Sequence, residues 1–592
     1  MNAEIIITEA LGKAVEKLYG TVPASEALQV QATRKEFEGD YTVVVFPLLR
    51  ISRRSPEQTA SEMGKVILGM VPDIESYQVI KGFLNLKMSP EYWMNRLQDI
   101  SGNPDYGMKS PSGRTVMIEF SSPNTNKPLH LGHIRNNLLG WSVSRILEAN
   151  GHRVIKVNLV NDRGIHICKS MLSWLRYGQN ITPESSGIKG DHLVGDFYVR
   201  FDRQYREQVK ELVSGGMDEE QAQKEAPIMQ EAQSMLVKWE QGNRQVIDLW
   251  KKMNGWVYEG FERTYERMGI SFDKIYYESD TYLLGKELVM KGLEDGAFYR
   301  NPDGSVWCDL TAEGLDHKLL LRADGTSVYM TQDLGTAVSR YQEYGFETHI
   351  YVVGNEQNYH FQVLKLILKK LGFSWADDII HLSYGMVELP EGRMKSREGT
   401  VVDADDLMDN MVDTARETSL ESGKLGDMTP EGQERLFEVL GIGALKYFIL
   451  KVDPRRTMLF DPRESIDFNG NTGPFIQYTF ARIRSILRKA ARRGYHSRLC
   501  HRPMLEKELR LIKLMTDYPR IIEESGQAFS PAQIANFSFD LAREFNQYYH
   551  EVTVLHEEDS ELRDQRLLLL EQVGRLLESA MGLLGIILPE RM

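Results

Sequence analysis

The chain has 592 residues, of which 42% are hydrophobic and 26% are charged. It contains no apolar run long enough to span a bilayer and no basic, apolar leader, so we expect a globular protein without a membrane-spanning helix or signal peptide. The 84 acidic and 71 basic residues give a net charge of −13, which is not the overall charge of a nucleic-acid-binding protein, so any such role depends on local basic segments.

The three cysteines, Cys168, Cys308 and Cys500, lie far apart in the sequence. This spacing argues against a disulfide framework and against a cysteine zinc site, and it favours a cytoplasmic protein.

Residues 1–110 are expected to form a small α+β domain. Residues 3–18 have a helical pattern, residues 41–48 are rich in β-forming residues, and residues 82–88 alternate like a strand. Residues 101–113 are rich in Gly, Pro, Ser and Asn, which is typical of a linker.

Residues 111–390 are expected to form an α/β domain with a parallel, Rossmann-type sheet. Strand-like runs at 115–120 and 153–160 flank a polar turn at 121–128 and a helical run at 131–150. Strand, helix and strand in this order form a βαβ unit, in which the two strands are parallel.

The same domain is expected to carry an insertion at about residues 165–300. Residues 205–270 are charged and helical in period. Strand-like runs return at 349–353 and 381–387, with a helical run at 360–371 between them.

The rest of the chain is predicted to be mainly helical. Residues 391–445 contain a glycine-flanked loop and a connecting segment, and residues 446–592 are expected to form an all-α bundle. Apolar residues recur at helical spacing at 435–451, 475–493, 504–526, 532–551 and 563–584.

The segment Glu119-Phe-Ser-Ser-Pro-Asn-Thr-Asn-Lys-Pro-Leu-His-Leu-Gly-His133 predicts a phosphate site. A helix that begins near His130, at the carboxyl edge of a parallel sheet, favours phosphate binding. His130 and His133 share a helix face and can donate hydrogen bonds to a phosphate, while Gly132 leaves room for a ligand. A structural histidine pair and a metal-binding pair are the alternatives.

Residues 392–400, Gly-Arg-Met-Lys-Ser-Arg-Glu-Gly-Thr, place three basic residues between two glycines. Such a loop can close Lys395 and Arg397 onto a triphosphate. A solvated surface turn is the alternative interpretation.

Asp333 ends the segment Asp324-Gly-Thr-Ser-Val-Tyr-Met-Thr-Gln-Asp333. If a helix begins at Tyr329, Tyr329 and Asp333 share a face, and Asp333 and Glu119 are available to one pocket. Two carboxylates bind a guanidinium through directional hydrogen bonds. Taken singly, each acid is more commonly a surface or capping residue.

A basic stripe lies within an acid-free stretch between Asp467 and Glu506. Its members in residues 482–502 are Arg482, Arg484, Arg488, Lys489, Arg492, Arg493, Arg498 and Arg502. Nearby aromatic and histidine side chains make an RNA-binding surface one interpretation, and a solvated face is the other.

Together these segments resemble one family, the arginyl-tRNA synthetases of class I. His130-Leu-Gly-His133 resembles the HIGH signature of the class, and the preceding Ser-Ser-Pro-Asn and Lys-Pro are typical of the arginyl family. Residues 324–333 resemble its arginine-binding stretch, residues 471–478 the start of its anticodon-binding domain, and residues 584–592 its C-terminus. The resemblance covers essentially the whole chain.

The resemblance implies a role for each of several residues. Arginine would be bound by Glu119, Ser121, Asn124, Tyr329, Asp333 and Gln357. ATP would be bound by His130, Gly132, His133, Gly385, Met386, Val387, Lys395 and Arg397. Catalysis would rest on Lys127, His130, His133 and Lys395. tRNA would be contacted by Arg482, Arg484, Arg488, Tyr548, Tyr549 and Met592, with residues 1–110 near its elbow.

The chain departs from the family pattern at three points. Ser396 occupies the place of the second lysine of the KMSKS loop, and the resemblance suggests that Lys127 supplies the missing charge. Asn161-Asp-Arg-Gly164 stands where the family often has Gly-Asp-Trp-Gly. Phe37-Glu-Gly-Asp-Tyr41 carries one residue more than the usual Phe-Gly-Asp-Tyr of the family.

The implied activity is the ligation of L-arginine to tRNA(Arg), with ATP as a substrate. Mg²⁺ is expected with the ATP, but no metal bound by the protein itself. We expect a monomer with no membrane or DNA partner. The family also implies that tRNA must bind before arginine is activated.

Three other functions remain open. Another class I synthetase, such as the cysteinyl one, would usually need a zinc site, and no such ligand cluster is visible in the sequence. A non-catalytic tRNA-binding paralogue would be expected to lose the histidines or Lys395. A small-molecule nucleotidyltransferase would not need a helical C-terminal domain with a basic stripe.

Overall fold

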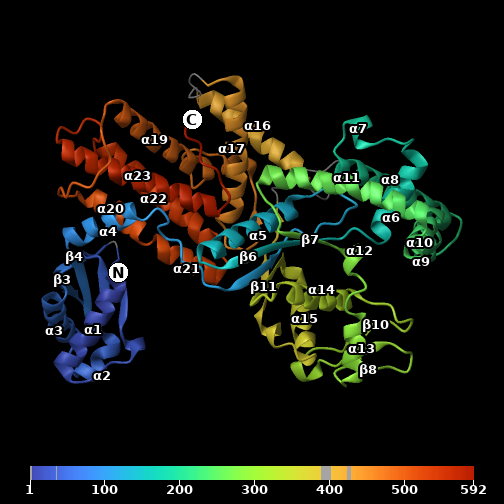
Figure 1. Cartoon of the computed structure of the whole chain (residues 1–592), viewed down its shortest axis with the longest axis horizontal. Helices are drawn as coiled ribbons and strands as arrows, with labels where there is room; N and C mark the ends of the chain where they lie inside the picture. Colours follow the sequence, from blue (N-terminus) through green and yellow to red (C-terminus); the bar gives the residue numbers. More distant parts are fainter. Residues whose placement is uncertain (1–2, 35, 389–401, 423–427) are drawn as a thin grey trace. The chain divides into compact units, whose positions relative to one another are not determined.

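The computed structural model describes the whole chain except residues 1–2, 35, 389–401 and 423–427 (Figure 1). It divides into two compact units. The first comprises Met1–Tyr106, Ile486–Asp517 and Glu544–Gly574, and the second comprises Gly107–Ser485, Tyr518–Arg543 and Arg575–Met592.

The N-terminal part of the first unit is a four-stranded antiparallel sheet with helices. The strand order is β1-β2-β4-β3, with β1 (Gln29–Ala32), β2 (Tyr41–Val44), β3 (Ile74–Ile80) and β4 (Phe83–Met88). The helices are α1 (Ala3–Tyr19), α2 (Leu49–Ser52), α3 (Pro56–Met70) and α4 (Pro90–Gly102). Serines cap α3 and α4, and a proline follows each cap, which is a strong helix start signal. The predicted α+β character is confirmed.

A five-stranded parallel sheet forms the centre of the second unit. Its order is β12-β11-β5-β6-β7, and every neighbouring pair is parallel. The strands are β5 (Thr115–Glu119), β6 (Arg153–Val160), β7 (Lys274–Tyr277), β11 (Thr348–Gly354) and β12 (Ile379–Tyr384). This is the doubly wound order in which the chain changes direction between β5 and β11. The predicted Rossmann-type sheet is confirmed.

Helices cover both faces of this sheet. Helix α5 (Leu131–Ala149) lies on one face, and α14 (Tyr329–Tyr344) and α15 (Asn358–Lys370) lie on the other (Figure 1). Apolar side chains of β5 and β6, such as Met117 and Val157, join those of α14 and α15 in one buried core. Both faces of the strands are therefore covered, which explains their nearly continuous apolar runs.

A helical insertion separates β6 from β7. It consists of α6 (Ile165–Tyr177), α7 (Pro183–Ser186), α8 (Gly190–Ser214), α9 (Glu219–Glu225), α10 (Pro227–Glu240) and α11 (Arg244–Met268). The sequence pattern does not predict β7, which lies inside the range assigned to the insertion. This strand has only four residues at the sheet edge, too few for a clear period-two signal.

A small antiparallel sheet precedes α14. It has the order β10-β9-β8 and follows α12 (Glu278–Thr281) and α13 (Lys286–Glu294). Its strands are β8 (Tyr299–Arg300), β9 (Val306–Cys308) and β10 (Lys318–Leu321).

The described C-terminal part is almost entirely helical, as predicted. The elements are β13 (Val387–Glu388), α16 (Ala404–Ser422), α17 (Pro430–Leu450), β14 (Met458–Leu459), α18 (Pro462–Ser465), α19 (Gly473–Arg492), α20 (Glu506–Thr516), α21 (Tyr518–Ala528), α22 (Ala532–Glu551) and α23 (Ser560–Leu583). The single helix predicted at 504–526 is two helices, because Pro519 lacks a backbone N–H and fits only in a first turn.

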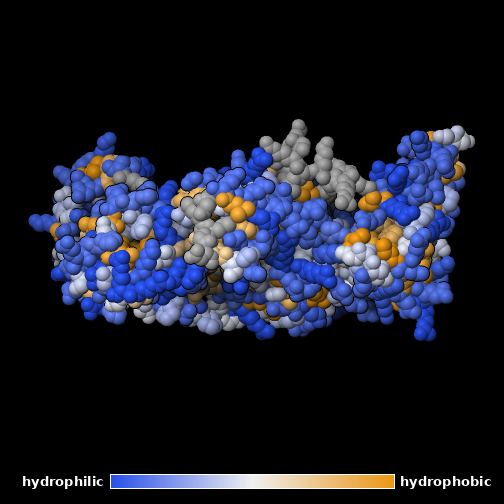
Figure 2. All heavy atoms as spheres, turned by 90° about the horizontal axis from the view of Figure 1, so that it is seen from above, coloured by the Kyte–Doolittle hydropathy of each residue, from blue (hydrophilic) through white to orange (hydrophobic). Residues whose placement is uncertain are grey.

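Within the described ranges, no helix combines the length and apolar character needed to cross a bilayer. The face of the molecule in Figure 2 is mainly hydrophilic, and its apolar side chains form small, separate patches.

Candidate active site

The candidate site lies at the carboxyl ends of β5 and β11, where the strand order reverses. Ligands of doubly wound sheets bind in the crevice at this point. Glu119 ends β5, the segment Asn355–Gln357 follows β11, and His130 caps the N-terminus of α5. The sheet therefore brings the two ends of the segment from Glu119 to His133 together with Gln357.

The loop after β5 is held in an uncommon backbone conformation. Ser121 and Ser122 have φ values of 79° and 47°, a left-handed region that non-glycine residues seldom adopt. The Asn136 side chain accepts from the Ser121 N–H at 2.5 Å, and the Asn158 side chain accepts from the Ser122 N–H at 3.0 Å. The buried Ser121 hydroxyl lies 2.7 Å from the Tyr265 hydroxyl. This hydrogen bond helps to hold the loop in its conformation.

The two histidines hold each other at the start of α5. The Gly132 N–H donates to His130 Nδ1 at 3.1 Å, and the His130 N–H donates to His133 Nδ1 at 3.2 Å. Their ring centroids are 3.9 Å apart. Because each Nδ1 accepts a hydrogen bond, each neutral ring carries its proton on Nε2. The pair therefore offers two Nε2–H donors.

Both imidazoles are held in the neutral form. Burial and the charge of Lys127 lower the pKa of His130 to about 4. Burial, followed by the charges of His130 and Lys127, lowers the pKa of His133 well below its usual value. Lys127 thus lies close enough to act on both rings electrostatically.

Packing against the His130 ring gives a structural reason for a glycine at position 132. A Cβ at this position would lie 3.0 Å from Cε1 and 3.1 Å from Nδ1 of His130. The glycine therefore accommodates the His130 ring, and the expected role of making room for a ligand stays a prediction.

Glu119 already has an internal partner. Arg340 Nη1 donates to one carboxylate oxygen, and the Ser122 hydroxyl donates to the other at 3.2 Å. Glu119 and Arg340 are 6% and 1% exposed, and the Arg340 guanidinium also lies 4.6 Å from the ring centroid of Tyr276. A buried guanidinium of the chain therefore neutralises the first of the two predicted carboxylates.

Tyr329 and Asp333 share a face of α14, as predicted from the sequence. Tyr329 is 76% exposed. The Asp333 carboxylate lies 2.6 Å from His360 Nε2, on α15. Asn124 and Gln357 are both exposed, and backbone bridging joins Asn124 to Asn161 after β6.

Glu278 is a candidate site residue that the sequence did not reveal. Burial raises its pKa, with the charge of Arg163 opposing the shift and the charges of Asp162 and Asp333 adding to it. It therefore lies in the same electrostatic environment as Asp333. Glu278 follows the short edge strand β7, so its position becomes visible only once that strand is placed in the sheet.

The Asn161–Gly164 turn, uncertain in the sequence, holds the segment that carries Glu278. Asp162 is 1% exposed and accepts from the Ser279 N–H, the Ser279 hydroxyl and the Tyr258 hydroxyl at 2.7–2.9 Å. Arg163 lies over the Tyr282 ring at 3.9 Å from its centroid. The turn is thus tied to α11, to α12 and to Tyr282 after α12.

The backbone expected to hold adenine already makes internal hydrogen bonds. The Gly385 N–H donates to Pro454, and the Met386 carbonyl accepts from Met458 and from Arg135. Val387 belongs to β13, which pairs with β14. Lys395 and Arg397 lie outside the described residues.

A polar cluster joins α8 to the start of α16. Asp191, His192 and Asp405 have a spacing that could suit a metal ion. However, the Lys189 ammonium lies 2.6 Å from Asp405 and 3.2 Å from Asp191. An ammonium therefore already compensates these carboxylates.

The predicted tRNA-contacting side chains are in different environments. The Arg482 guanidinium lies 4.8 Å from the Tyr478 ring centroid, and Arg484 pairs with Glu590 at 2.6 Å. Arg488 also lies on α19, and Met592 is half-buried.

Tyr549 is 38% exposed, whereas Tyr548 is fully buried and donates to Glu508 at 3.4 Å. A direct RNA contact by Tyr548 therefore does not fit this structure, because neighbouring helices enclose its ring.

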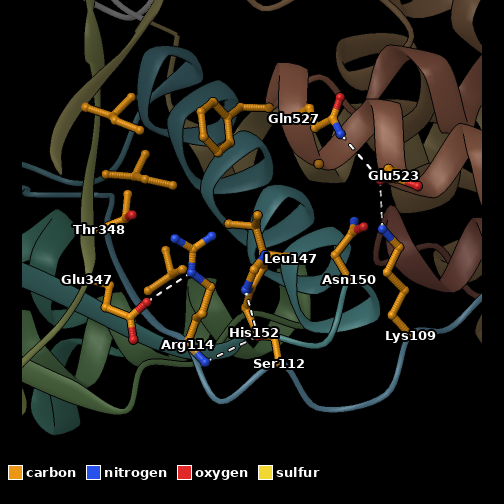
Figure 3. A pocket seen from close by; sticks show the side chains of 15 residues that line it. Lys109, Ser112, Arg114, Leu147, Asn150, His152, Glu347, Thr348, Glu523 and Gln527 are labelled. Carbon is orange, nitrogen blue, oxygen red and sulfur yellow. Dashed lines mark hydrogen bonds and ion pairs between the residues drawn. The ribbon is translucent and has the colours of Figure 1, made fainter. Parts of the chain in front are cut away.

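A cavity of about 470 Å³ lies elsewhere, at the amino ends of β5 and β11 (Figure 3). Its charged side chains pair with each other: Arg114 donates to Glu347, and Lys109 contacts Glu523. It is on the opposite edge of the sheet from the histidines, so it is not part of the candidate active site.

Comparisons with known proteins show which family the chain resembles. The family model "tRNA synthetases class I (R), catalytic domain" matches residues 97–461, and the model "DALR anticodon binding domain" matches residues 476–592. The chain is 56% identical to an arginine–tRNA ligase of Phocaeicola vulgatus and 50% identical to one of Flavobacterium psychrophilum, with 100% of each chain covered.

Solved structures share the fold. An arginyl-tRNA synthetase of Thermus thermophilus has a TM-score of 0.79 at 24% identity and covers 100% of both chains. One of Plasmodium falciparum has a TM-score of 0.74 at 19% identity, over 99% of this chain and 98% of that one. Because the catalytic-domain model matches more than half of the chain and the relatives match its full length, the chain belongs to the arginine–tRNA ligases, the arginyl members of the class I tRNA synthetases.

Proposed function

We propose that the chain activates L-arginine with ATP and transfers it to the 2′-hydroxyl of the terminal adenosine of tRNA(Arg). The arginine carboxylate attacks the α-phosphorus in line, and pyrophosphate leaves. The ribose hydroxyl then attacks the carbonyl of the adenylate, and AMP leaves. The observation that carries this proposal is the pair of neutral Nε2–H donors at the N-terminus of α5.

These donors suit a phosphate that gains charge in the transition state. Hydrogen bonds aimed at developing charge are a major source of catalysis, and removing one such donor costs about 10²–10³ in rate. In this tautomer both Nε2 atoms carry protons and are not available as metal ligands. Mg²⁺ would be held mainly by the triphosphate and water, as is usual for this ion.

Recognition of the arginine side chain is proposed for Asp333, Glu278 and Tyr329. Arg340 already neutralises the Glu119 carboxylate, so Glu119 would contribute to the shape of the pocket and not to its charge. Asn124 and Gln357 would bind the amino-acid end of the substrate arginine. A lysine ammonium cannot satisfy planar, paired acceptors, and sites of this kind reject such analogues by about 10⁴–10⁵.

Binding of tRNA is proposed for Arg482, Arg484 and Arg488 on α19, together with Tyr549 and Met592. Residues 1–110 would approach the elbow of the tRNA. Lys395 and Arg397 would contact the triphosphate.

The decisive experiment is the charging of total tRNA with each of the twenty amino acids. We expect charging with arginine alone. Charging with another amino acid, or with none, would refute the proposed function. A cysteinyl synthetase, the alternative left open by the sequence, would charge cysteine.

A further inference from the structure

Helix α8 packs directly against the peptide that leads into the histidines. A Cβ at Gly195 would lie 2.9 Å from Pro128 Cδ and 3.6 Å from Lys127 Cα. A contact below 3.0 Å forces a shift in tightly packed structure. The backbone of α8 therefore sets the position of the Lys127–Pro128 peptide.

The N-terminal turn of the same helix holds the segment that follows residue 401. His192 Nε2 lies 2.9 Å from Asp405 and 3.6 Å from Asp403, and Lys189 Nζ lies 2.6 Å from Asp405. These side chains are between 15% and 29% exposed. Charge-assisted contacts of this kind are strong when they are shielded from water.

That segment in turn pairs with the backbone around His130. His130 and Asp403 form an antiparallel bridge. The Leu131 N–H donates to Val402, and the Ala404 N–H donates to Leu129, both at 2.9 Å. Asp403 also caps α16 by accepting from the N–H groups of Asp405 and Asp406. A displacement of residues 402–405 would therefore displace the start of α5.

Helix α8 can fix the position of residues 402–405 because α11 packs tightly against it. Lys189 also donates to Thr264, which donates to Asp405 at 3.1 Å. A Cβ at Gly260 would lie 2.3 Å from Asp191 Oδ1, so the two helices are in close contact. The cluster thus connects the insertion, the segment 402–405 and the histidines.

The protonation of His192 supports a charged contact. Burial lowers its pKa, but the hydrogen bond to Asp405 and the charges of Asp403 and Asp191 outweigh this and raise the pKa to about 9. Hydrogen bonds from His192 and the charge of Lys189 hold the pKa of Asp405 well below its usual range, against the effect of burial.

We propose that Lys189, the N-cap residue of α8, and His192 and Gly195 of α8 are positioning residues for adenylate formation. They fix Lys127 and the start of α5 through the Pro128 contact and through Asp403 and Asp405. This inference rests on the activity proposed above. No residue of α8 need touch the substrates.

The test is arginine-dependent pyrophosphate exchange with saturating tRNA, measured for His192→Ala, His192→Gln and Gly195→Ala in the full chain. We expect kcat to fall about 10- to 100-fold, because small misplacements of catalytic groups have effects of this size. The KM for arginine should stay within about twofold, since the arginine pocket is built from other elements. The deficit of His192→Gln should shrink above pH 9, where wild-type His192 loses its charge.

Two matched controls separate positioning from folding. Gly255→Ala on α11 changes a helical glycine with no atom near its Cβ, and His317→Gln changes a histidine 3.8 Å from Asp309, in the connection between β9 and β10. Both should keep wild-type kcat.

The inference is overturned if folded His192→Ala and Gly195→Ala enzymes keep wild-type kcat, even with a lower Tm. It is also overturned if KM for arginine rises while kcat is unchanged. Absence of exchange in the wild-type enzyme would instead contradict the proposed function.

Discussion

At the scale of single residues, the histidine pair shows how local contacts set a chemical state. Each ring accepts a backbone N–H at Nδ1, so its tautomer follows from the helix start itself. Burial and Lys127 keep His130 neutral. Lys127 therefore helps to keep the rings in the neutral donor form, in addition to the positive charge that it is proposed to supply to the phosphates.

The first prediction is that Lys127→Ala slows adenylate formation by about 10²-fold, the effect expected when a transition-state contact is lost. The KM for arginine should change little, because Lys127 is proposed to act on the phosphates and not on the arginine side chain. Pyrophosphate exchange with tRNA at varied arginine concentrations measures both quantities. An effect confined to the KM for arginine would contradict this role, as would a silent Lys127→Ala alongside a severe Ser396→Ala.

The same substitution predicts a shift in the titration of His130. Its pKa of about 4 lies below the ordinary value of 6.5, so its contribution to stability is complete above pH 6.5 and declines as pH falls towards 4. Removal of Lys127 takes away one cause of the low value. In NMR titrations, the pKa of His130 should rise in Lys127→Ala.

The second prediction concerns Asp333. Replacing it by Ala removes one of the two carboxylates proposed to bind the substrate guanidinium, at a cost of about 2–5 kcal/mol, and should raise the KM for arginine accordingly. ATP binding should be unchanged. Asp324→Ala, in the exposed turn before α14, is the control because its carboxylate bonds only within its own turn. A wild-type KM for Asp333→Ala would exclude Asp333 from the pocket.

At the scale of elements, the sequence predicts what is encoded by neighbouring residues. The strand, loop and helix of residues 115–149 form one contiguous pattern, so both the sheet and the histidine site can be predicted from it. The partners of Glu119 and Tyr548 cannot, because Arg340 and Glu508 are distant in sequence. The edge strand β7 rejoins the sheet only after the long helical insertion. The position of Glu278, which follows β7, therefore cannot be predicted from the sequence either.

The third prediction belongs to the turn after β6. Asp162→Asn removes the charge that holds Ser279 and Tyr258, and lost hydrogen bonds to a charged group cost about 1.5–3 kcal/mol each. Since Ser279 is adjacent to Glu278, we expect both a lower Tm and a higher KM for arginine. Asp280→Asn, an exposed change on the same short helix, should alter neither. A lower Tm with an unchanged KM would limit Asp162 to a purely structural role.

At the scale of the whole molecule, the fourth prediction is that tRNA controls activation. We expect no arginine-dependent pyrophosphate exchange in RNA-free enzyme and robust exchange when tRNA is added, a form of induced fit. Binding should weaken steeply with salt, because the basic residues of α19 neutralise phosphates. Full exchange without RNA would refute this coupling.

The C-terminal residues provide a physical route for such coupling within the second unit. Ser142 and Arg145, on the helix that begins with the histidines, donate to the carbonyls of Leu583 and Gly582 at 2.9 and 2.8 Å. Lys446 of α17 donates to Gly585 at 2.6 Å. Side-chain donors thus satisfy carbonyls that a helix end leaves without partners, and the cations suit the negative end of α23.

The last prediction tests this route through Lys446. Burial, helped by the charge of Arg145, lowers its pKa to about 8, so the ammonium that donates to Gly585 is still mostly charged near neutral pH. Lys446→Met should keep the fold, because it removes a buried charge at similar volume. It should also loosen residues 582–587 from α5 and reduce tRNA-stimulated exchange several-fold, while tRNA affinity stays near the wild-type value. Lys369→Met, which changes a surface pair with Asp377, is the control. If Lys446→Met is stimulated by tRNA as fully as the wild type, the contact between α17 and the C-terminal residues does not carry the coupling.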